Sequence, residues 1–193
     1  MTDGQWILDM KVFKDTMRPA ISTGLSVTRV GGVGQNSRQK GLAAKLNKTL
    51  AGYYQAEEYA HFGTELSADA QLDYDTGKML FKVMNQDIGE GYNLMEQQFM
   101  LDIVLNSSAI EIIDIKKLKE LVGDYASRVK ETKDESNFDE LRDDLKGKIT
   151  TIDEVAKKRL EAEAAKQKAA EAQAAAAAQA AEIEQSANEE GAK

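Results

Sequence analysis

The sequence predicts a mainly α-helical protein, a helical bundle preceded by two short strands and followed by an alanine-rich tail. From residue 37 to about residue 160, apolar residues recur every three or four positions, the period of an amphipathic helix. Before residue 35, they alternate with polar residues or stand among β-branched residues, which is typical of strands. Beyond residue 160, nearly every apolar residue is alanine. We therefore divide the chain into residues 1–35, 36–160 and 161–193.

The two strands are predicted on either side of Pro19, the only proline of the chain. Residues 5–13 alternate apolar and polar side chains over most of their length, which favours a strand. The Arg18–Pro19 pair favours an extended or turn conformation, because proline restricts the residue before it. Residues 24–30 are short and β-branched, and the glycines of residues 31–34 then predict a hinge before the first long helix.

Cap residues mark the boundaries of the first helices. The first is predicted from residue 37 to about residue 62, with Gly63 as its C-terminal cap. Ser67, Asn93 and Asp114 each precede an apolar periodic stretch, and their side chains suit the N-cap of a helix. The sequence therefore predicts four consecutive amphipathic helices up to about residue 129.

The C-terminal third is predicted as a connector, a short helix and a final helix. Residues 130–136 form a charged connector, and a helix over residues 138–145 is expected to end in a turn at Gly147–Lys148. Residues 151–154 (TIDE) fit a capping pattern that opens the last helix. From residue 161 onward no broad apolar face remains, so the tail is predicted as a solvated helix or as disordered.

Composition excludes several classes of function. The net charge of −8 makes the chain a poor partner for nucleic acid, because phosphate would be repelled. The absence of cysteine excludes thiol catalysis and disulfides. The longest apolar run, residues 99–105, is interrupted by Asp102 and is too short to span a bilayer. We therefore expect no nucleic-acid binding and no direct membrane insertion.

No self-contained catalytic site is predicted. The glycines of residues 31–34 are not followed by the Gly-Lys-Ser/Thr of a phosphate-binding P-loop. His61 is the only histidine, so no pair of histidines can bind zinc, and we predict no metal site. On the residues alone, a free-standing helical interaction module without catalytic activity stays open as an alternative function.

One stretch resembles a known family. Residues 17–32 read MRPAISTGLSVTRVGG, similar to the F-type ATP synthase alpha subunit, which reads approximately IRPAINVGLSVSRVG at this point. Shorter likenesses follow at residues 2–5 (TDGQ), 60–66 (AHFGTEL) and 147–149 (GKI). The resemblance extends over residues 2–160 and leaves the tail outside it.

The resemblance implies a place for each part of the chain. Residues 1–35 would be the C-terminal end of an α/β nucleotide-binding domain, and residues 36–160 the helical domain that follows it. The chain is then expected to be the last portion of a much longer subunit, whether a truncated form, the product of a split gene or an incomplete gene model.

The resemblance also implies roles for five residues. Arg29 matches the arginine finger that the alpha subunit inserts into the ATP site of the neighbouring beta subunit. A permanently charged guanidinium there stabilises the charge that develops on the transferred phosphoryl group. Phe13, Arg18, Pro19 and Gln86 match the adenine side of the alpha subunit's own non-catalytic nucleotide site.

Ligands, partners and location follow from the same resemblance. The complete subunit would bind ATP or ADP with Mg, whereas this chain alone, without a P-loop, is expected to bind none. The implied partners are beta subunits in a hetero-hexameric ring and the central gamma stalk. The complex would couple ATP synthesis to proton transport at the cytoplasmic face of an energy-transducing membrane, as a peripheral assembly. Two departures, Thr16–Met17 and Ile88, stand where the family has Gly-Ile and a second glutamine.

Overall fold

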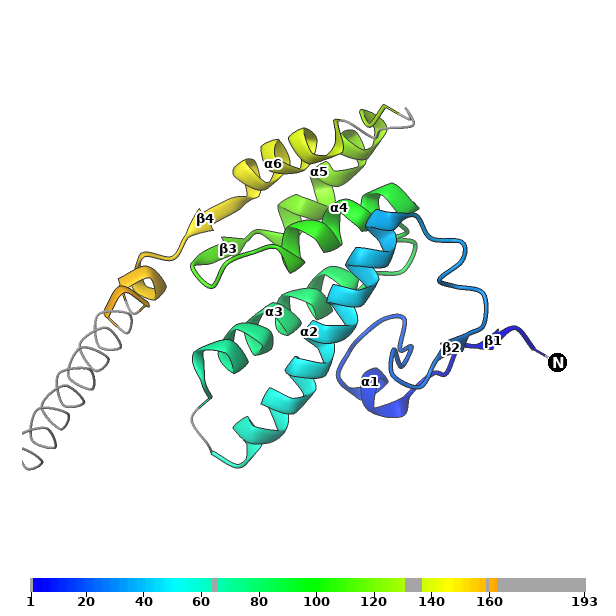
Figure 1. Cartoon of the computed structure of the whole chain (residues 1–193), viewed down its shortest axis with the longest axis horizontal. Coiled ribbons are helices and arrows are strands. Elements are labelled where there is room, and N and C mark those ends of the chain that lie inside the picture. Colours follow the sequence, from blue (N-terminus) through cyan, green and yellow to red (C-terminus); the bar gives the residue numbers. More distant parts are fainter. Residues whose placement is uncertain (1, 64–65, 131–136, 159, 163–193) are drawn as a thin grey trace, which may run out of the picture. The chain divides into compact units, whose positions relative to one another are not determined.

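The computed structural model describes residues 2–63, 66–130, 137–158 and 160–162 (Figure 1). The chain divides into two units, Met1–Thr151 and Ile152–Lys193. The elements, in chain order, are β1 (Gly4–Gln5), α1 (Met10–Lys14), β2 (Val27–Thr28), α2 (Ser37–His61), α3 (Ala68–Met84), α4 (Leu94–Leu105), β3 (Glu111–Ile113), α5 (Ile115–Ser127), α6 (Phe138–Ile149) and β4 (Thr150–Ile152). The mainly helical fold predicted from the sequence is confirmed.

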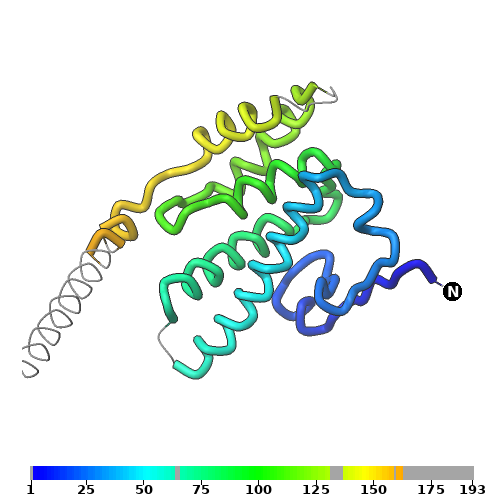
Figure 2. Tube along the Cα trace, in the orientation of Figure 1, coloured from blue at the N-terminus to red at the C-terminus, as the bar shows by residue number. Residues whose placement is uncertain are grey.

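The N-terminal segment is a short antiparallel ribbon that encloses one helical turn. β1 pairs with β2, with Gly4 opposite Thr28 and Gln5 opposite Val27, and a bridge joins Leu8 to Ile21. The predicted extended segment over residues 24–30 is thus confirmed in β2. Figure 2 shows this segment looping back beside α2 before the chain enters the first long helix.

The strand predicted over residues 5–13 is wrong beyond Gln5. The Asp9 side chain accepts a hydrogen bond from the Lys11 backbone N–H at 2.8 Å, and this cap starts α1. The alternating apolar side chains of Trp6, Leu8 and Met10 are all exposed, by 84%, 74% and 67%. The alternation of these three residues therefore does not mark a buried face of a sheet.

The predicted caps of the long helices are confirmed. Gly63 follows α2 with φ of +69°, the left-handed conformation that glycine adopts without strain. The Ser67 side chain accepts from Ala70 N at 3.3 Å, and the Asp114 side chain accepts from Lys117 N at 3.0 Å. Asn93 forms a full capping box with the third residue of α4. α3, α4 and α5 thus begin where a local side chain accepts a hydrogen bond from one or two of their free N–H groups.

α2 and α3 form an antiparallel hairpin that is packed unusually closely at one point (Figure 1). Tyr53 of α2 lies against Gly77 of α3, where an added Cβ would come within 2.5 Å of the tyrosine ring. The same ring stacks on Tyr74 at 5.4 Å between centroids and meets Phe81 edge-on at 5.1 Å. A glycine in the middle of a helix is explained here by the close approach of the neighbouring helix.

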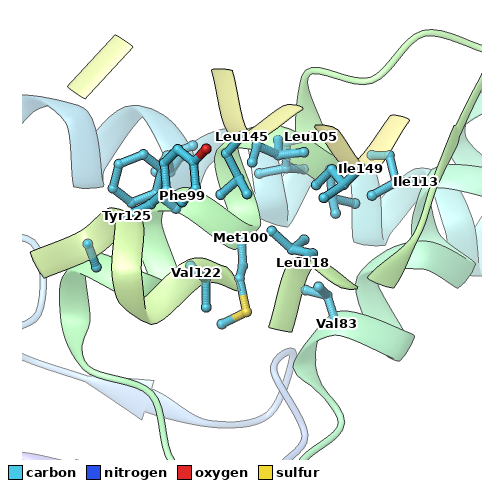
Figure 3. Close-up of a cluster of buried hydrophobic side chains, with 14 of the residues drawn as sticks. Val83, Phe99, Met100, Leu105, Ile113, Leu118, Val122, Tyr125, Leu145 and Ile149 are labelled. Atoms are coloured by element: carbon cyan, nitrogen blue, oxygen red, sulfur yellow. The ribbon is translucent and has the colours of Figure 1, made fainter. Parts of the chain in front are cut away.

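The hydrophobic core is centred on α4, which is covered by α2, α3, α5 and α6. Figure 3 shows labelled side chains of α3, α4, α5 and α6 meeting, with Met100 of α4 near the middle and the Phe99 ring beside Tyr125. Phe99 stacks on Phe138 of α6 at 4.2 Å between ring centroids. The largest fully buried side chains come from α3 to α6: Phe99, Phe138, Leu80, Ile103, Leu118, Leu145, Val104 and Val122.

One carboxylate lies inside this core. Asp102 of α4 is 7% exposed, and its Oδ1 accepts from Asn106 Nδ2 at 2.7 Å. Arg142 of α6 donates to the same oxygen at 3.4 Å and also binds Asp139 and Asp143 at 2.9 Å. The carboxylate that interrupts the apolar run of α4 therefore ties α4 to α6, because a buried charge needs a partner.

The end of the bundle differs from the prediction in two places. Gly147 lies within α6, which continues to Ile149, because an exposed glycine alone does not end a helix that is packed on one side. Thr150–Ile152 forms β4, which pairs with β3, so Thr151 is not a cap. Its place is taken by Asp153, which accepts from Val155 N at 2.9 Å and Ala156 N at 3.1 Å. Residues 131–136 of the predicted connector, and the predicted tail beyond residue 162, lie outside the described residues.

Candidate functional site

The structure brings the four predicted adenine-side residues to one place. After α1 the chain turns at Arg18–Pro19, whose peptide bond is cis, and lies against the loop that joins α3 to α4. The Arg18 backbone N–H donates to Asn85 Oδ1 at 2.7 Å, and the Gln86 N–H donates to the Arg18 carbonyl at 2.8 Å. Residues that are 67 positions apart in the sequence are thereby fixed side by side.

A cavity of about 320 Å³ opens beside this junction, and both Pro19 and Gln86 line it. Its other walls come mainly from apolar and aromatic side chains, and no lysine or arginine stands among the described residues that line it. Such a lining, with the two amides of Gln86 and Gln97, suits a flat, uncharged ring that an amide can orient, and it offers no cation to a phosphate. Further lining residues include Val12, Met17, Tyr54, Phe81, Tyr92 and Met100.

The Arg18 side chain folds back onto its own segment. Its guanidinium carbon lies 3.8 Å from the centre of the Phe13 ring, which is a cation–π contact. Nη1 donates to the carbonyl of Phe13 at 2.9 Å and to that of Met17 at 2.8 Å. Arg18 and Phe13 therefore form one stacked unit, whose position is set by the junction with Asn85 and Gln86.

Arg29 lies apart from this group, directly after β2. Its backbone N–H donates to the Asp3 carbonyl at 2.9 Å, and its Nη2 lies 2.5 Å from Asp3 Oδ1. The side chains of the two residues are 70% and 67% exposed. The structure thus presents Arg29 to solvent at the end of the ribbon, where its guanidinium is within reach of an anion on another molecule.

A charged cluster that the sequence did not reveal supports the α3–α4 loop. The Tyr92 hydroxyl donates to Glu90, and Lys119 Nζ of α5 lies 3.3 Å from Glu90 Oε1. The hydrogen bond from Tyr92, with help from the Asp87 N–H and Lys119, holds the pKa of Glu90 below its usual value. Burial, and then the hydrogen bond to Glu90, raise the pKa of Tyr92. Glu90 and Tyr92 are near neighbours in the sequence, but only the fold adds Lys119 to them, so no spacing in the sequence could have indicated the whole cluster.

The fold and this site define a class: a C-terminal helical bundle with an extended segment docked on it. The family described as ATP synthase alpha/beta chain, C terminal domain, matches residues 35–167, more than half of the chain. The chain belongs to this family and corresponds to the C-terminal portion of the alpha subunit.

Curated relatives support the same assignment. The ATP synthase subunit alpha of Wolbachia sp. subsp. Drosophila simulans (strain wRi) is 33% identical over 156 residues, which cover 79% of this chain and 30% of the relative. The sodium ion specific alpha subunit of Acetobacterium woodii is 29% identical over 157 residues, which cover 80% and 30%. The chain therefore spans about a third or less of the length of these relatives.

A solved structure has a similar fold. The structure of a unique ATP synthase subunit, NeqB, from Nanoarcheaum equitans aligns with a TM-score of 0.52 at 22% identity, covering 54% of this chain and 27% of that one. This likeness concerns the fold alone.

None of the helices in the described part of the chain combines the length and the apolar character that a membrane span requires.

Proposed function

We propose that this chain works as the C-terminal part of an alpha subunit in the catalytic headpiece of an ATP synthase. In this proposal Arg29 enters the ATP site of a neighbouring beta subunit as an arginine finger. The observation that carries it is the exposed Arg29 guanidinium, which the ribbon holds outward at the end of β2. A finger needs a charge that its own subunit leaves accessible, since it acts on phosphoryl oxygens held by another chain.

The four adenine-side residues support a further part of the proposal, a nucleotide site on the alpha subunit itself. Phe13, Arg18, Pro19 and Gln86 would face the base of an ATP or ADP whose phosphates, with Mg, are bound by the nucleotide-binding domain of a complete subunit. The largely apolar cavity beside Pro19 and Gln86 suits the base and leaves the phosphates to that domain.

The assembly and its location are proposed on the same basis. The exposed apolar side chains of the N-terminal segment, such as Trp6, Leu8 and Val27, favour packing against further protein. We propose beta subunits and the central gamma stalk as partners, in a peripheral complex at the cytoplasmic face of an energy-transducing membrane. Proton coupling is proposed from the F-type resemblance, although the name of the Acetobacterium woodii relative specifies sodium.

The test replaces the corresponding region of a relative's alpha subunit with residues 2–162 of this chain and assembles the chimaera with that relative's beta and gamma subunits. Arg29→Ala is expected to lower multisite ATP hydrolysis by roughly 10³-fold or more, because the charge on the phosphoryl group loses its partner. Arg29→Lys keeps the charge but not the planar fork, and should fall between Arg29→Ala and the parent chimaera.

The matched control is Arg128→Ala, since Arg128 is another exposed arginine, placed at the end of α5. It should leave turnover unchanged, and nucleotide binding by beta should change little in every variant. An Arg29→Ala chimaera that hydrolyses ATP as fast as its parent would remove the finger assignment.

A further inference from the structure

One peptide unit of the bundle, between Asn85 and Gln86, makes half of the attachment of the Arg18–Pro19 turn. The carbonyl of Asn85 accepts a hydrogen bond from Lys119 Nζ at 2.5 Å, and the N–H on the other side of the same peptide, that of Gln86, donates to the Arg18 carbonyl at 2.8 Å. A peptide group is planar, so fixing the direction of its oxygen also fixes the direction of its N–H. Lys119 therefore sets the orientation of the donor that binds Arg18.

The Asn85 side chain makes the second half of this attachment. Asn85 is the C-cap of α3, where its backbone N–H donates to the Phe81 carbonyl at 3.0 Å. Its Oδ1 accepts from the Arg18 N–H at 2.7 Å. The N–H and the C=O of Arg18 are thus both hydrogen-bonded to the C-terminal end of α3.

The Lys119 side chain is held in place by contacts with Glu90 and Tyr92. It is 18% exposed, its Nζ lies 3.3 Å from Glu90 Oε1, and it lies 5.7 Å from the centre of the Tyr92 ring. A charged donor makes a stronger hydrogen bond than a neutral one, and it polarises the peptide it binds, which strengthens the next bond in the chain. A continuous series of polar contacts therefore links α5 to the N-terminal segment. It runs from Glu90 through Lys119 and the Asn85–Gln86 peptide to Arg18.

We propose that Asn85 and Lys119 are positioning residues that hold the Arg18–Pro19 turn at a fixed place on the helical bundle. The purpose of this placement, to present the adenine side of a nucleotide site, rests on the proposed function above. The attachment itself rests only on the contacts of this chain, so the two can be tested separately.

The first test is hydrogen exchange of the full chain, followed by mass spectrometry with fragments that resolve the amides of Arg18 and Gln86. Asn85→Ala removes the acceptor of the Arg18 N–H, and that amide should exchange about fivefold to tenfold faster, as expected for the loss of one hydrogen bond. Lys119→Met should accelerate the Gln86 amide by a similar factor. Asn85→Asp keeps the acceptor and Lys119→Arg keeps a donor, so both should restore most of the protection.

The end of α4 offers a matched control. Asn106 is the C-cap of α4, its carbonyl accepts from Lys146 Nζ at 3.1 Å, and its Oδ1 accepts from Lys45. Asn106→Ala and Lys146→Met therefore remove a C-cap side chain and a lysine bond to the cap carbonyl without touching Arg18, and Asn106→Ala also removes the hydrogen bond to Asp102. They should leave the Arg18 and Gln86 amides as protected as in the parent chain. The inference is overturned if Asn85→Ala and Lys119→Met do not accelerate these amides, or if the control variants accelerate them equally.

A second measurement separates this inference from the proposed function. In the assembled chimaera, Asn85→Ala should weaken the retention of an adenine nucleotide at the non-catalytic site. Faster exchange at Arg18 with unchanged retention would leave the positioning role standing and would contradict the adenine-side role. Unchanged exchange would contradict the positioning role, whatever the nucleotide does.

Discussion

Replacing Gly77 by alanine should destabilise the α2–α3 hairpin, although the same change stabilises most helices. A Cβ at residue 77 would lie 2.5 Å from Tyr53 Cδ2 and 2.6 Å from Tyr53 Cβ, well inside van der Waals contact. Tyr53 has little room to move away, because its ring stacks on Tyr74 and its hydroxyl donates to Glu57 at 2.9 Å. The two helices must therefore separate to admit the methyl group.

The expected size of the effect is a balance of two terms. Glycine in a helix interior costs about 1 kcal/mol relative to alanine, so the substitution gains this amount. Overpacking a tightly packed site costs about 1–3 kcal/mol, and a clash with a Cβ that cannot rotate away belongs at the upper end. We expect Gly77→Ala to lower the free energy of unfolding by about 1–2 kcal/mol.

Gly41→Ala is the matched control. Gly41 also lies inside a helix, α2, but nothing lies within 4 Å of a Cβ added there. This variant should be more stable than the parent by up to about 1 kcal/mol. Both free energies come from urea unfolding followed by far-UV circular dichroism. If Gly77→Ala proves as stable as Gly41→Ala, the proposed close contact between the helices is wrong.

Two further predictions concern charged groups. Asp102→Ala should lower the free energy of unfolding by about 1–2 kcal/mol in urea titrations, since a buried hydrogen-bonded carboxylate is lost. The control, Asp143→Ala, removes an exposed carboxylate and should change this free energy by less than about 0.5 kcal/mol. Equal effects of the two substitutions would contradict the role of Asp102. Glu90 has a lowered pKa when folded, so its contribution is complete above its ordinary pKa near 4.3 and is lost as the pH falls through the folded value. Glu90→Gln should therefore flatten the decline of the urea midpoint below about pH 4.5, and an unchanged decline would show that Glu90 is not responsible.

The helices could be predicted because their signals are local. A cap such as Ser67 or Asn93 lies within three residues of the N–H groups it binds, and the apolar period of α5 reflects the face that the core buries. Where partners are distant, the same reasoning failed. Thr151 fits a capping pattern, yet it lies in β4, which pairs with β3, a strand that the sequence did not indicate.

The candidate site shows the same division. Resemblance supplied Phe13, Arg18, Pro19 and Gln86, and the fold does bring them together, although their roles stay predictions. Asn85, in contrast, acts on a residue 67 positions away, and Lys119 acts on Asn85 from 34 positions away. Neither residue type is diagnostic by itself, because asparagine at a helix end and lysine in a helix are both ordinary.

The ion pair between Asp3 and Arg29 makes anion binding by Arg29 an exchange reaction. When the Arg29 guanidinium binds an oxygen of another molecule, it must give up its ion pair with the Asp3 carboxylate, and not only its contacts with water. A singly charged carboxylate offers Arg29 nothing that Asp3 does not already supply, whereas a phosphoryl group carries more charge and more acceptor oxygens. In the proposed role of Arg29, Asp3 would therefore be an internal competitor, at a cost to the incoming anion of at most about 1 kcal/mol because the ion pair is exposed.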